Sequence, residues 1–254
     1  MATQSTVLRY GSGVKEMLIT EQKVAVFKIR ELWFADKPYD ISGCHSVVFR
    51  ACKNRVTDTE FECSEFPTLV LDLTQDLDVI WSNMGKKSCR YEIRRATRDG
   101  VKVQISTDFA GFCKLNKSFR KMKGLADSVD LSYIERYGTL LTANIGSELV
   151  AGQVYLEDKD NIRWLLGASK RLEVGDSERV LVGCANRALI WEAIQYAKCK
   201  GIREFDFGGY HSGDNPDLKA INFFKQTFGG VLVTHYIYQK DYSRLYAIAR
   251  RVKR

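Results

Sequence analysis

Proline is scarce in this sequence, with 3 among 254 residues, whereas 45% of the residues are hydrophobic. We therefore expect most of the chain to fold around a core, with little disorder. No apolar run approaches the ~20 residues that a membrane-spanning helix requires. The first residues, Met-Ala-Thr-Gln-Ser-Thr, lack the basic segment and apolar stretch of a secretory signal. The sequence thus predicts neither a membrane span nor secretion.

The cysteines lack any recognisable spacing. None of the seven belongs to a Cys-x-x-Cys pair, and no zinc spacing occurs among positions 44, 52, 63, 89, 113, 184 and 199. An odd, scattered set of cysteines is typical of reduced thiols inside the cell. We therefore expect a cytoplasmic protein without a metal site.

Several catalytic signatures are also missing. The sequence contains no Walker loop, no His-Glu-x-x-His motif, no Gly-x-Ser-x-Gly elbow and no Ser-His-Asp signature. A hydrolase, a kinase or a metalloenzyme therefore has no support from the sequence.

What the chain does have is positive charge. Lys and Arg number 39 against 31 Asp and Glu, a net charge of +8, and the basic residues cluster at 86–87, 90–98, 114–123 and 250–254. One interpretation is that these clusters are solvated helix faces. The other is an anionic ligand, such as a nucleotide, the phosphates of coenzyme A or RNA. Charge alone does not choose between them.

The pattern of hydrophobic residues changes near residue 75, from one that indicates strands alone to one that indicates both helices and strands. Before this point, short β-branched segments predict strands at 24–34, 46–52 and 68–73. Beyond it, we predict helices at 76–84, 89–99, 108–122 and 131–140, and strands at 101–106, 141–145, 149–156 and 162–168. The turn at 158–161 should join the last two strands as an antiparallel hairpin. The pattern predicts an α+β fold, with an N-terminal β-rich portion at residues 1–75 and a second domain at 76–254.

The most distinctive segment is 183–230, which alternates helix, strand and helix with glycine at each turn. The first helix is predicted to begin near Ala185 and to end at Gly201, because apolar residues recur at helical period between them. A strand follows at 202–207, and a second helix runs from about Asp217 to the Gly229-Gly230 stop.

This segment resembles the GNAT superfamily of acyltransferases, and within it the Fem-type aminoacyl transferases of peptidoglycan synthesis. The resemblance lies in three motifs in the expected order: Asn-x-x-Leu-x-Trp-x-x-Ile, Phe-Asp-Phe-Gly-Gly and Phe-Lys-x-x-Phe-Gly-Gly. With the helix at 81–100 and the hairpin at 148–171, it covers roughly the last two-thirds of the chain. It implies a mixed, largely antiparallel central sheet flanked by helices.

The resemblance also implies a reaction. In this superfamily an amine attacks an acyl thioester directly, so coenzyme A would be a co-substrate and no cofactor would be permanently bound. We expect its diphosphate at Gly183, Cys184, Ala185 and Asn186, since free amides at a helix start attract anions. The basic position of the superfamily signature holds Val180 here, so an ordinary helix start is the alternative.

The candidates for the chemistry are His211, Asp206, Tyr210 and Lys225. His211 is the first candidate for the base that takes the proton of the amine, because histidine is the side chain whose ordinary pKa lies closest to neutral pH. Asp206 lies between two phenylalanines, so its side chain should point to the opposite face of the strand. There it would either lie in the cleft or cap the loop that follows the strand. By resemblance to the Fem-type Phe-Lys pair, Lys225 would contact negative charge on the donor or at the reacting carbonyl, with Phe224 beside the substrate. The alternatives are an exposed loop histidine, a structural aspartate and a solvated lysine.

The acceptor that we favour is an amino sugar attached to a nucleotide, as used for cell-surface polysaccharides. Arg90 and Arg94 lie four residues apart on one predicted helix face and, with Lys121 and Lys123, would bind its diphosphate. The partners expected are therefore small molecules.

Two other functions stay open. One is a Fem-type transferase that uses aminoacyl-tRNA to modify a peptidoglycan precursor; against it, the full family has two such domains and a helical arm, too much for 254 residues. The other is a non-catalytic nucleic-acid-binding module, which would bind with strong salt dependence and no sequence preference. The sequence does not determine the oligomeric state.

Overall fold

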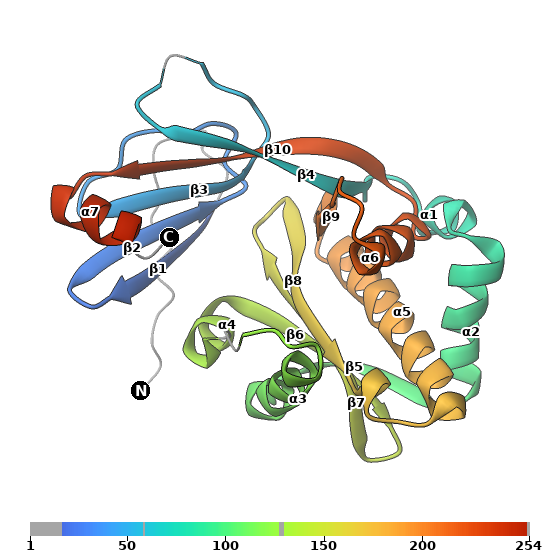
Figure 1. Cartoon of the computed structure of the whole chain (residues 1–254). Helices are drawn as coiled ribbons and strands as arrows, with labels where there is room; N and C mark the ends of the chain where they lie inside the picture. Colours follow the sequence, from blue (N-terminus) through green and yellow to red (C-terminus); the bar gives the residue numbers. More distant parts are fainter. Residues whose placement is uncertain (1–16, 58, 127–129, 253–254) are drawn as a thin grey trace. The chain divides into compact units, whose positions relative to one another are not determined.

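The computed structural model describes residues 17–57, 59–126 and 130–252 (Figure 1). Within these residues the chain forms strands and helices in the order β1 (Leu18–Val24), β2 (Phe27–Trp33), β3 (Ser46–Cys52), β4 (Glu62–Asp72), α1 (Leu77–Asn83), η1 (Lys86–Arg90), α2 (Tyr91–Arg98), β5 (Val101–Ser106), α3 (Phe109–Met122), α4 (Leu131–Tyr137), β6 (Gly138–Ile145), β7 (Glu148–Glu157), β8 (Asn161–Ser169), η2 (Lys170–Leu172), α5 (Asp176–Cys199), β9 (Glu204–Gly209), α6 (Pro216–Gln226), β10 (Val231–Asp241) and α7 (Arg244–Val252).

The described strands form one hydrogen-bonded order, β1-β2-β3-β10-β4-β9-β8-β7-β6-β5. The pairs β2–β3 and β8–β9 are parallel, whereas β1–β2, β3–β10, β5–β6, β6–β7 and β7–β8 are antiparallel. The predicted α+β fold with a mixed, largely antiparallel sheet flanked by helices is therefore confirmed.

The chain divides into two compact units, one made of Met1–Thr68 with Val233–Arg254 and the other of Leu69–Leu232. Strands β4 and β10 pass from one unit into the other, so each contributes residues to both. The predicted division at residue 75 stays a prediction. All the candidate site residues lie in the second unit.

The core of the first unit is formed by β2, β3 and β10. Its fully buried members are Leu32, Val47, Phe49, Cys52 and Tyr238. The Tyr238 hydroxyl accepts a hydrogen bond from the Val56 amide at 2.6 Å, which satisfies its polar end inside an apolar cluster. This unit is thus built as a sheet packed against its own loops.

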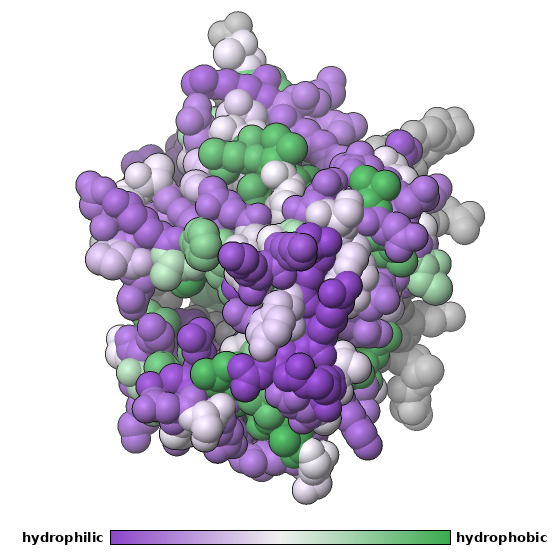
Figure 2. All heavy atoms as spheres, turned by 90° about the vertical axis from the view of Figure 1, so that its right-hand side faces the viewer, coloured by the Kyte–Doolittle hydropathy of each residue, from purple (hydrophilic) through white to green (hydrophobic). Residues whose placement is uncertain are grey.

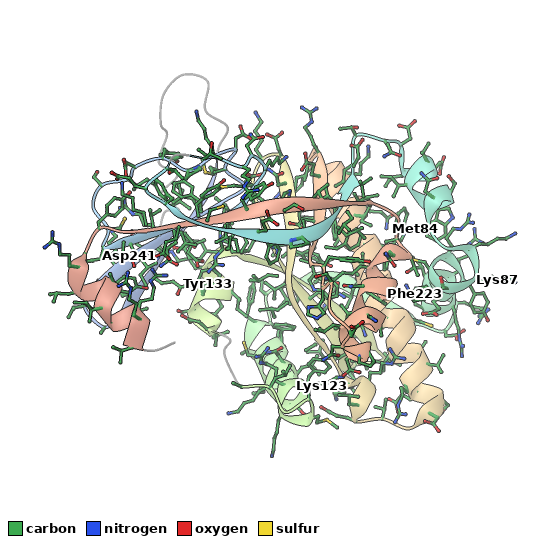
Figure 3. The ribbon with its side chains drawn as sticks, turned by 45° about the horizontal axis from the view of Figure 1, so that its top comes forward. Met84, Lys87, Lys123, Tyr133, Phe223 and Asp241 are labelled. Carbon is green, nitrogen blue, oxygen red and sulfur yellow. The ribbon has the colours of Figure 1, made fainter. Side chains whose placement is uncertain are left out.

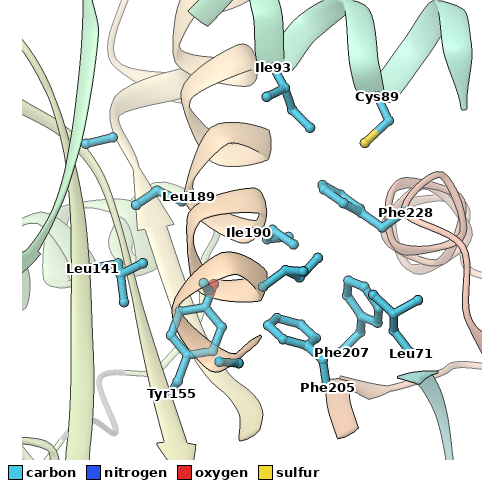
Figure 4. Close-up of a cluster of buried hydrophobic side chains, with 14 of the residues drawn as sticks. Leu71, Cys89, Ile93, Leu141, Tyr155, Leu189, Ile190, Phe205, Phe207 and Phe228 are labelled. Atoms are coloured by element: carbon cyan, nitrogen blue, oxygen red, sulfur yellow. The ribbon is translucent and has the colours of Figure 1, made fainter. Parts of the chain in front are cut away.

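The second unit places helices on both faces of its strands. Neighbouring residues of β6 show the two faces, because side chains alternate along a strand: Leu140 packs with α3 and α4, and Leu141 packs with α5. On the α5 side, Phe205 and Phe207 from β9 meet the same cluster (Figure 4). The long helix α5 therefore lies between the sheet and α2, whose contacts with α5 are extensive (Figure 1).

Local sequence signals placed several elements correctly. The strands at 46–52 and 101–106 are confirmed, and Asp108 caps α3 by accepting a hydrogen bond from the Gly111 amide at 2.8 Å. The strand predicted at 24–34 is confirmed over β2 (Phe27–Trp33), but its start is wrong: Val24 ends β1, and the chain turns at Ala25, where φ is +54°. The helix predicted to reach residue 140 ends at Tyr137.

None of the helices within the described ranges is long and apolar enough to cross a membrane.

Gly230 provides a test of the second unit's packing. Its φ is +98°, and an added Cβ would lie 2.8 Å from the Val70 carbonyl oxygen; Gly100, at φ +84°, has nothing within 4 Å of such an atom. Gly100→Ala should therefore cost only the backbone strain, roughly 1–2 kcal/mol. Gly230→Ala should cost clearly more, because backbone atoms must also move. Urea unfolding of both variants measures the difference, and equal losses would contradict this account.

Candidate active site at the junction of β8 and β9

The candidate site is built where two parallel strands part. The pairing of β8 with β9 covers three residue pairs and ends at Arg163 and Asp206, although β8 continues to Ser169. Just beyond, Gly208 has φ +76°, and an added Cβ would lie 3.0 Å from the Trp164 carbonyl oxygen. Only glycine fits this close approach, so the Phe-Asp-Phe-Gly-Gly motif has a structural reason.

Asp206 forms a buried ion pair with Arg163 at this junction. The alternation along β9 sends Phe205 and Phe207 into the core, and Asp206 to the other face, as the sequence predicted. One carboxylate oxygen of Asp206 accepts from Arg163, and the other accepts from the Gly208 amide at 2.7 Å. Both oxygens are thus occupied, which favours a positioning role over that of a base.

Lys225 lies in the last turn of α6 and is buried rather than solvated, with 6% of its surface exposed. Its ammonium donates to the Gly209 carbonyl at 2.6 Å and to the Gly208 carbonyl at 3.2 Å. Burial lowers the pKa of Lys225 from 10.5 to about 8, while Asp206 raises it and Arg163 lowers it further. An ammonium has three N–H donors, and the third has no acceptor among the residues that the structure describes.

Phe224 and Trp164 form the aromatic wall beside this lysine. The Trp164 ring lies 5.8 Å from the Lys225 ammonium, and its centroid is 6.4 Å from that of Phe224. Beneath them, the Arg187 guanidinium lies 4.5 Å from the Phe224 centroid. Arg187 is held by Glu92 at 2.7 Å and by the Thr227 hydroxyl at 2.6 Å, so it fixes the position of Phe224.

Two residues of this site, Arg187 and Trp164, were not predicted from the sequence. Arg187 had a signal, because it falls on the apolar face of the predicted helix, between Cys184 and Leu189, and is buried there. A charged residue on a buried helix face is costly unless an opposite charge or a hydrogen-bond acceptor lies beside it. Trp164 had no such signal, since a tryptophan inside a strand is an ordinary core residue.

Tyr210 and His211 lie in the loop between β9 and α6. The buried Asn222 holds the backbone of His211 from both sides: its amide group donates to the His211 carbonyl at 2.6 Å and its oxygen accepts from the His211 N–H at 3.2 Å. The Tyr210 hydroxyl accepts from Gln226 at 2.8 Å. The loop is thus anchored on the helix that carries Lys225, and the His211 side chain is exposed.

The predicted anion site at residues 183–186 does not have the expected geometry. Helix α5 begins at Asp176 rather than near Ala185, so Gly183, Cys184, Ala185 and Asn186 lie inside it, where amides bond to carbonyls one turn back. The true first turn carries Asp176 and Glu178. These carboxylates suit the helix dipole but repel a diphosphate.

The basic residues predicted to bind the acceptor do not come together. Arg94 lies on α2 with its guanidinium 5.4 Å from the Trp81 ring centroid, and Arg90 is half-buried on η1, next to α2. Lys121 and Lys123 lie at the end of α3, where Lys123 is 3.3 Å from Asp217 at the start of α6. Figure 3 shows Lys123 well away from Lys87, which precedes Arg90 on η1. The two pairs therefore belong to different surfaces.

Comparison of the sequence with protein-family models found no match, and neither did comparison with curated proteins. Comparison of structures found clear likenesses. FemX superposes with a TM-score of 0.64 at 12% identity, over 93% of this chain and 86% of that one. The C-terminal domain of a proposed lysylphosphatidylglycerol synthetase from Agrobacterium fabrum gives 0.58 at 13% identity, over 94% and 88%. L-PGS from Bacillus licheniformis gives 0.57 at 12% identity, over 93% and 84%.

At these identities the likeness shows the fold alone, and this chain shares that fold with FemX. The share of FemX that the match covers overturns one argument that we based on the length of the sequence. We reasoned that 254 residues are too few for a Fem-type chain, but the match spans 86% of FemX. Chain length therefore does not separate the two transferase hypotheses.

The buried ammonium of Lys225 predicts a pH-dependent contribution to stability. Between pH 8 and 10.5 the unfolded chain binds more protons than the folded one, so wild-type stability should rise with pH by up to ~3 kcal/mol from this group. Lys225→Met should lack this rise. Lys219, which is exposed and pairs with Asp214 at 2.7 Å, provides the control Lys219→Met. If the free energy of unfolding changes with pH in the same way for wild type and for Lys225→Met, burial of the charge is contradicted.

Proposed function

We propose that this protein is an N-acyltransferase in which an amine attacks an activated acyl group beside Lys225. The observation that carries the proposal is the buried Lys225 ammonium, which two backbone carbonyls hold while one N–H donor is left over. A donor oriented in this way, in surroundings of low dielectric constant, stabilises negative charge on the acyl oxygen as the tetrahedral centre forms.

The remaining parts of the site are assigned roles from their contacts. The attacking nitrogen forms a bond to the carbonyl carbon, the bond from that carbon to the carrier breaks, and the carrier leaves with the electron pair. The proton of the amine passes to His211 or to water, and the former is our first candidate because its loop is tied to α6. Asp206 keeps Gly208 and Arg163 in position, Tyr210 steadies the loop, and Phe224 packs against the substrate.

The donor is the point on which two candidates differ. An acyl-coenzyme A donor needs a diphosphate site, and the acidic first turn of α5 disfavours one at that helix end. That observation favours the second candidate, a Fem-type transferase with an aminoacyl-tRNA donor, whose ester needs no such site. If coenzyme A is used, only Gly183 and Asn186 of the residues at 183–186 could contact it along the helix surface, because Cys184 and Ala185 are fully buried.

For the acceptor we propose the amino group of a nucleotide-linked sugar in the acyl-coenzyme A case, or an amine of a peptidoglycan precursor in the aminoacyl-tRNA case. Lys121 and Lys123 support an anionic acceptor, because Lys123 reaches the start of α6, the helix that also carries Lys225. A cytoplasmic location is consistent with the cysteines, all seven of which are free thiols.

Removal of the Lys225 ammonium should abolish most of the activity. Lys225→Met keeps the length of the side chain and loses the donor, so turnover should fall ~10²-fold or more, the scale of a lost oxyanion contact. Lys219→Met, on the exposed side of the same helix, should retain wild-type turnover. Transfer of a radiolabelled acyl group measures both, and equal activity of the two variants would remove Lys225 from the mechanism.

The pH dependence of the rate separates the two ionisable candidates. If His211 is the base, the rate rises through neutrality, and His211→Ala flattens this limb and lowers turnover by ~10²-fold. If Lys225 acts as the ammonium, the rate falls as pH rises through about 8. A profile that His211→Ala leaves unchanged would show that the amine loses its proton to water.

The donor is identified by supplying each one alone. Acyl-coenzyme A and aminoacyl-tRNA are offered separately, each with both acceptors, a nucleotide-linked amino sugar and a peptidoglycan precursor, and product is detected by mass spectrometry. We expect transfer from aminoacyl-tRNA and none from acyl-coenzyme A, because of the carboxylates at the start of α5. Transfer from acyl-coenzyme A alone would reverse this preference and leave the role of Lys225 intact.

A further inference from the structure

A second concave site lies in the second unit, lined by residues other than those around Lys225. It is a pocket of about 520 Å³ between α1, α2, β5 and α5. Its floor is apolar, formed in part by Ile93, Val101 and Ala188, and its walls carry Trp81, Trp191, Arg94, Arg98, Glu192 and Gln195. None of the candidate catalytic residues lines it, so its chemistry is separate from that of the transfer reaction.

The two tryptophans form a continuous aromatic wall. The ring centroids of Trp81 and Trp191 are 4.9 Å apart with planes tilted by 53°, and both rings are partly exposed. They come from different helices, α1 and α5, so tertiary packing brings them together. An exposed indole wall above an apolar floor suits the flat face of a heterocyclic base.

The positive charge beside this wall is only partly neutralised. Within the described part of the chain, Arg94 has no carboxylate partner, and its guanidinium lies 5.4 Å from the centroid of the Trp81 ring. Arg98 pairs with Asp99 at 2.8 Å and keeps the rest of its guanidinium at the pocket rim, with 65% of the side chain exposed. Figure 2 turns this side of the molecule toward the viewer and shows strongly hydrophilic side chains gathered on it. A phosphate is the group that two such guanidinium forks bind best.

Opposite the arginines, α5 contributes hydrogen-bonding groups. Gln195 donates to Glu192 at 3.3 Å, and both residues line the pocket with side chains that carry acceptor oxygens. Acceptors of this kind bind the hydroxyls of a ribose or the amino group of a base. The pocket thus offers a stacking wall, two cations and a polar edge within the size of a single nucleotide.

From this arrangement we propose that the pocket binds a nucleotide unit, with the base against Trp81 and Trp191 and the phosphate between Arg94 and Arg98. The same unit occurs as a free nucleotide, in a nucleotide-linked small molecule and in a single-stranded RNA segment. The proposal concerns binding only and holds whether or not the chain transfers acyl groups.

The test measures affinity, with full-length protein and isothermal titration calorimetry. The probes are uridine 5′-monophosphate and adenosine 5′-monophosphate, the two nucleosides without phosphate, inorganic phosphate, and a six-residue single-stranded RNA. We expect at least one mononucleotide to bind more tightly than its nucleoside and than phosphate, since base and phosphate are held together. Tighter binding of the RNA than of the mononucleotide would identify a strand as the source, and equal binding would identify a free nucleotide.

Two variants and a matched control assign that binding to the pocket. Arg94→Ala should weaken mononucleotide binding about tenfold, and Ala188→Leu should weaken it similarly by filling the floor without changing any charge. The control is Arg136→Ala, which removes an exposed arginine lying 5.2 Å from the Tyr137 ring, outside the pocket. Circular dichroism of each variant checks folding. Wild-type protein that binds none of the probes at millimolar concentration overturns the proposal, as does binding that all three variants weaken equally or not at all.

Discussion

The candidate active site depends on a charge imbalance inside the second unit. One buried carboxylate, Asp206, interacts with two buried cations, Arg163 and Lys225. Burying charges is costly, and a single carboxylate satisfies the hydrogen-bonding needs of only one of the two cations. Lys225 must therefore take its acceptors from backbone carbonyls, and its pKa falls to about 8 as a result of burial. The site keeps a net positive charge that favours negative charge on a ligand.

The backbone of β9 makes this arrangement possible. Gly208 adopts a φ of +76° and approaches the Trp164 carbonyl at a distance that a side chain would not permit. The turn directs the carbonyls of Gly208 and Gly209 toward α6, and the Gly208 amide toward Asp206. A single two-residue turn thus supplies a donor to the carboxylate and two acceptors to the ammonium. The same turn leads into the loop of Tyr210 and His211, which Asn222 and Gln226 attach to α6.

The arginines that contribute to the positive charge of the sequence have different surroundings and different roles. Arg187 is used inside the protein, where Glu92, Thr227 and the ring of Phe224 surround it. Arg95 and Arg98 share the carboxylate of Asp99, which partly neutralises both of them. Arg94 is different, because it stands beside an aromatic pocket without a carboxylate partner in the described residues. A count of charges treats these arginines alike. Only the neighbours of each arginine show whether it supports the fold or is available to bind a ligand.

The sequence by itself determined the fold class, most element positions and the motifs at Phe205–Gly209 and Phe224–Gly230. These follow from local physics: the alternation along β9 orients Asp206 away from the core, and the Asp108 carboxylate caps α3 by accepting from the nearby Gly111 amide. Tertiary structure decided the rest, because burial depends on residues distant in the chain. Nothing local shows that Lys225 is buried against β9, that α5 begins nine residues before Ala185, or that Trp81 meets Trp191. The helix start was misplaced because its first two turns, at 176–182, mix charged and apolar residues without a clear period, whereas the buried face from Cys184 onward is continuous.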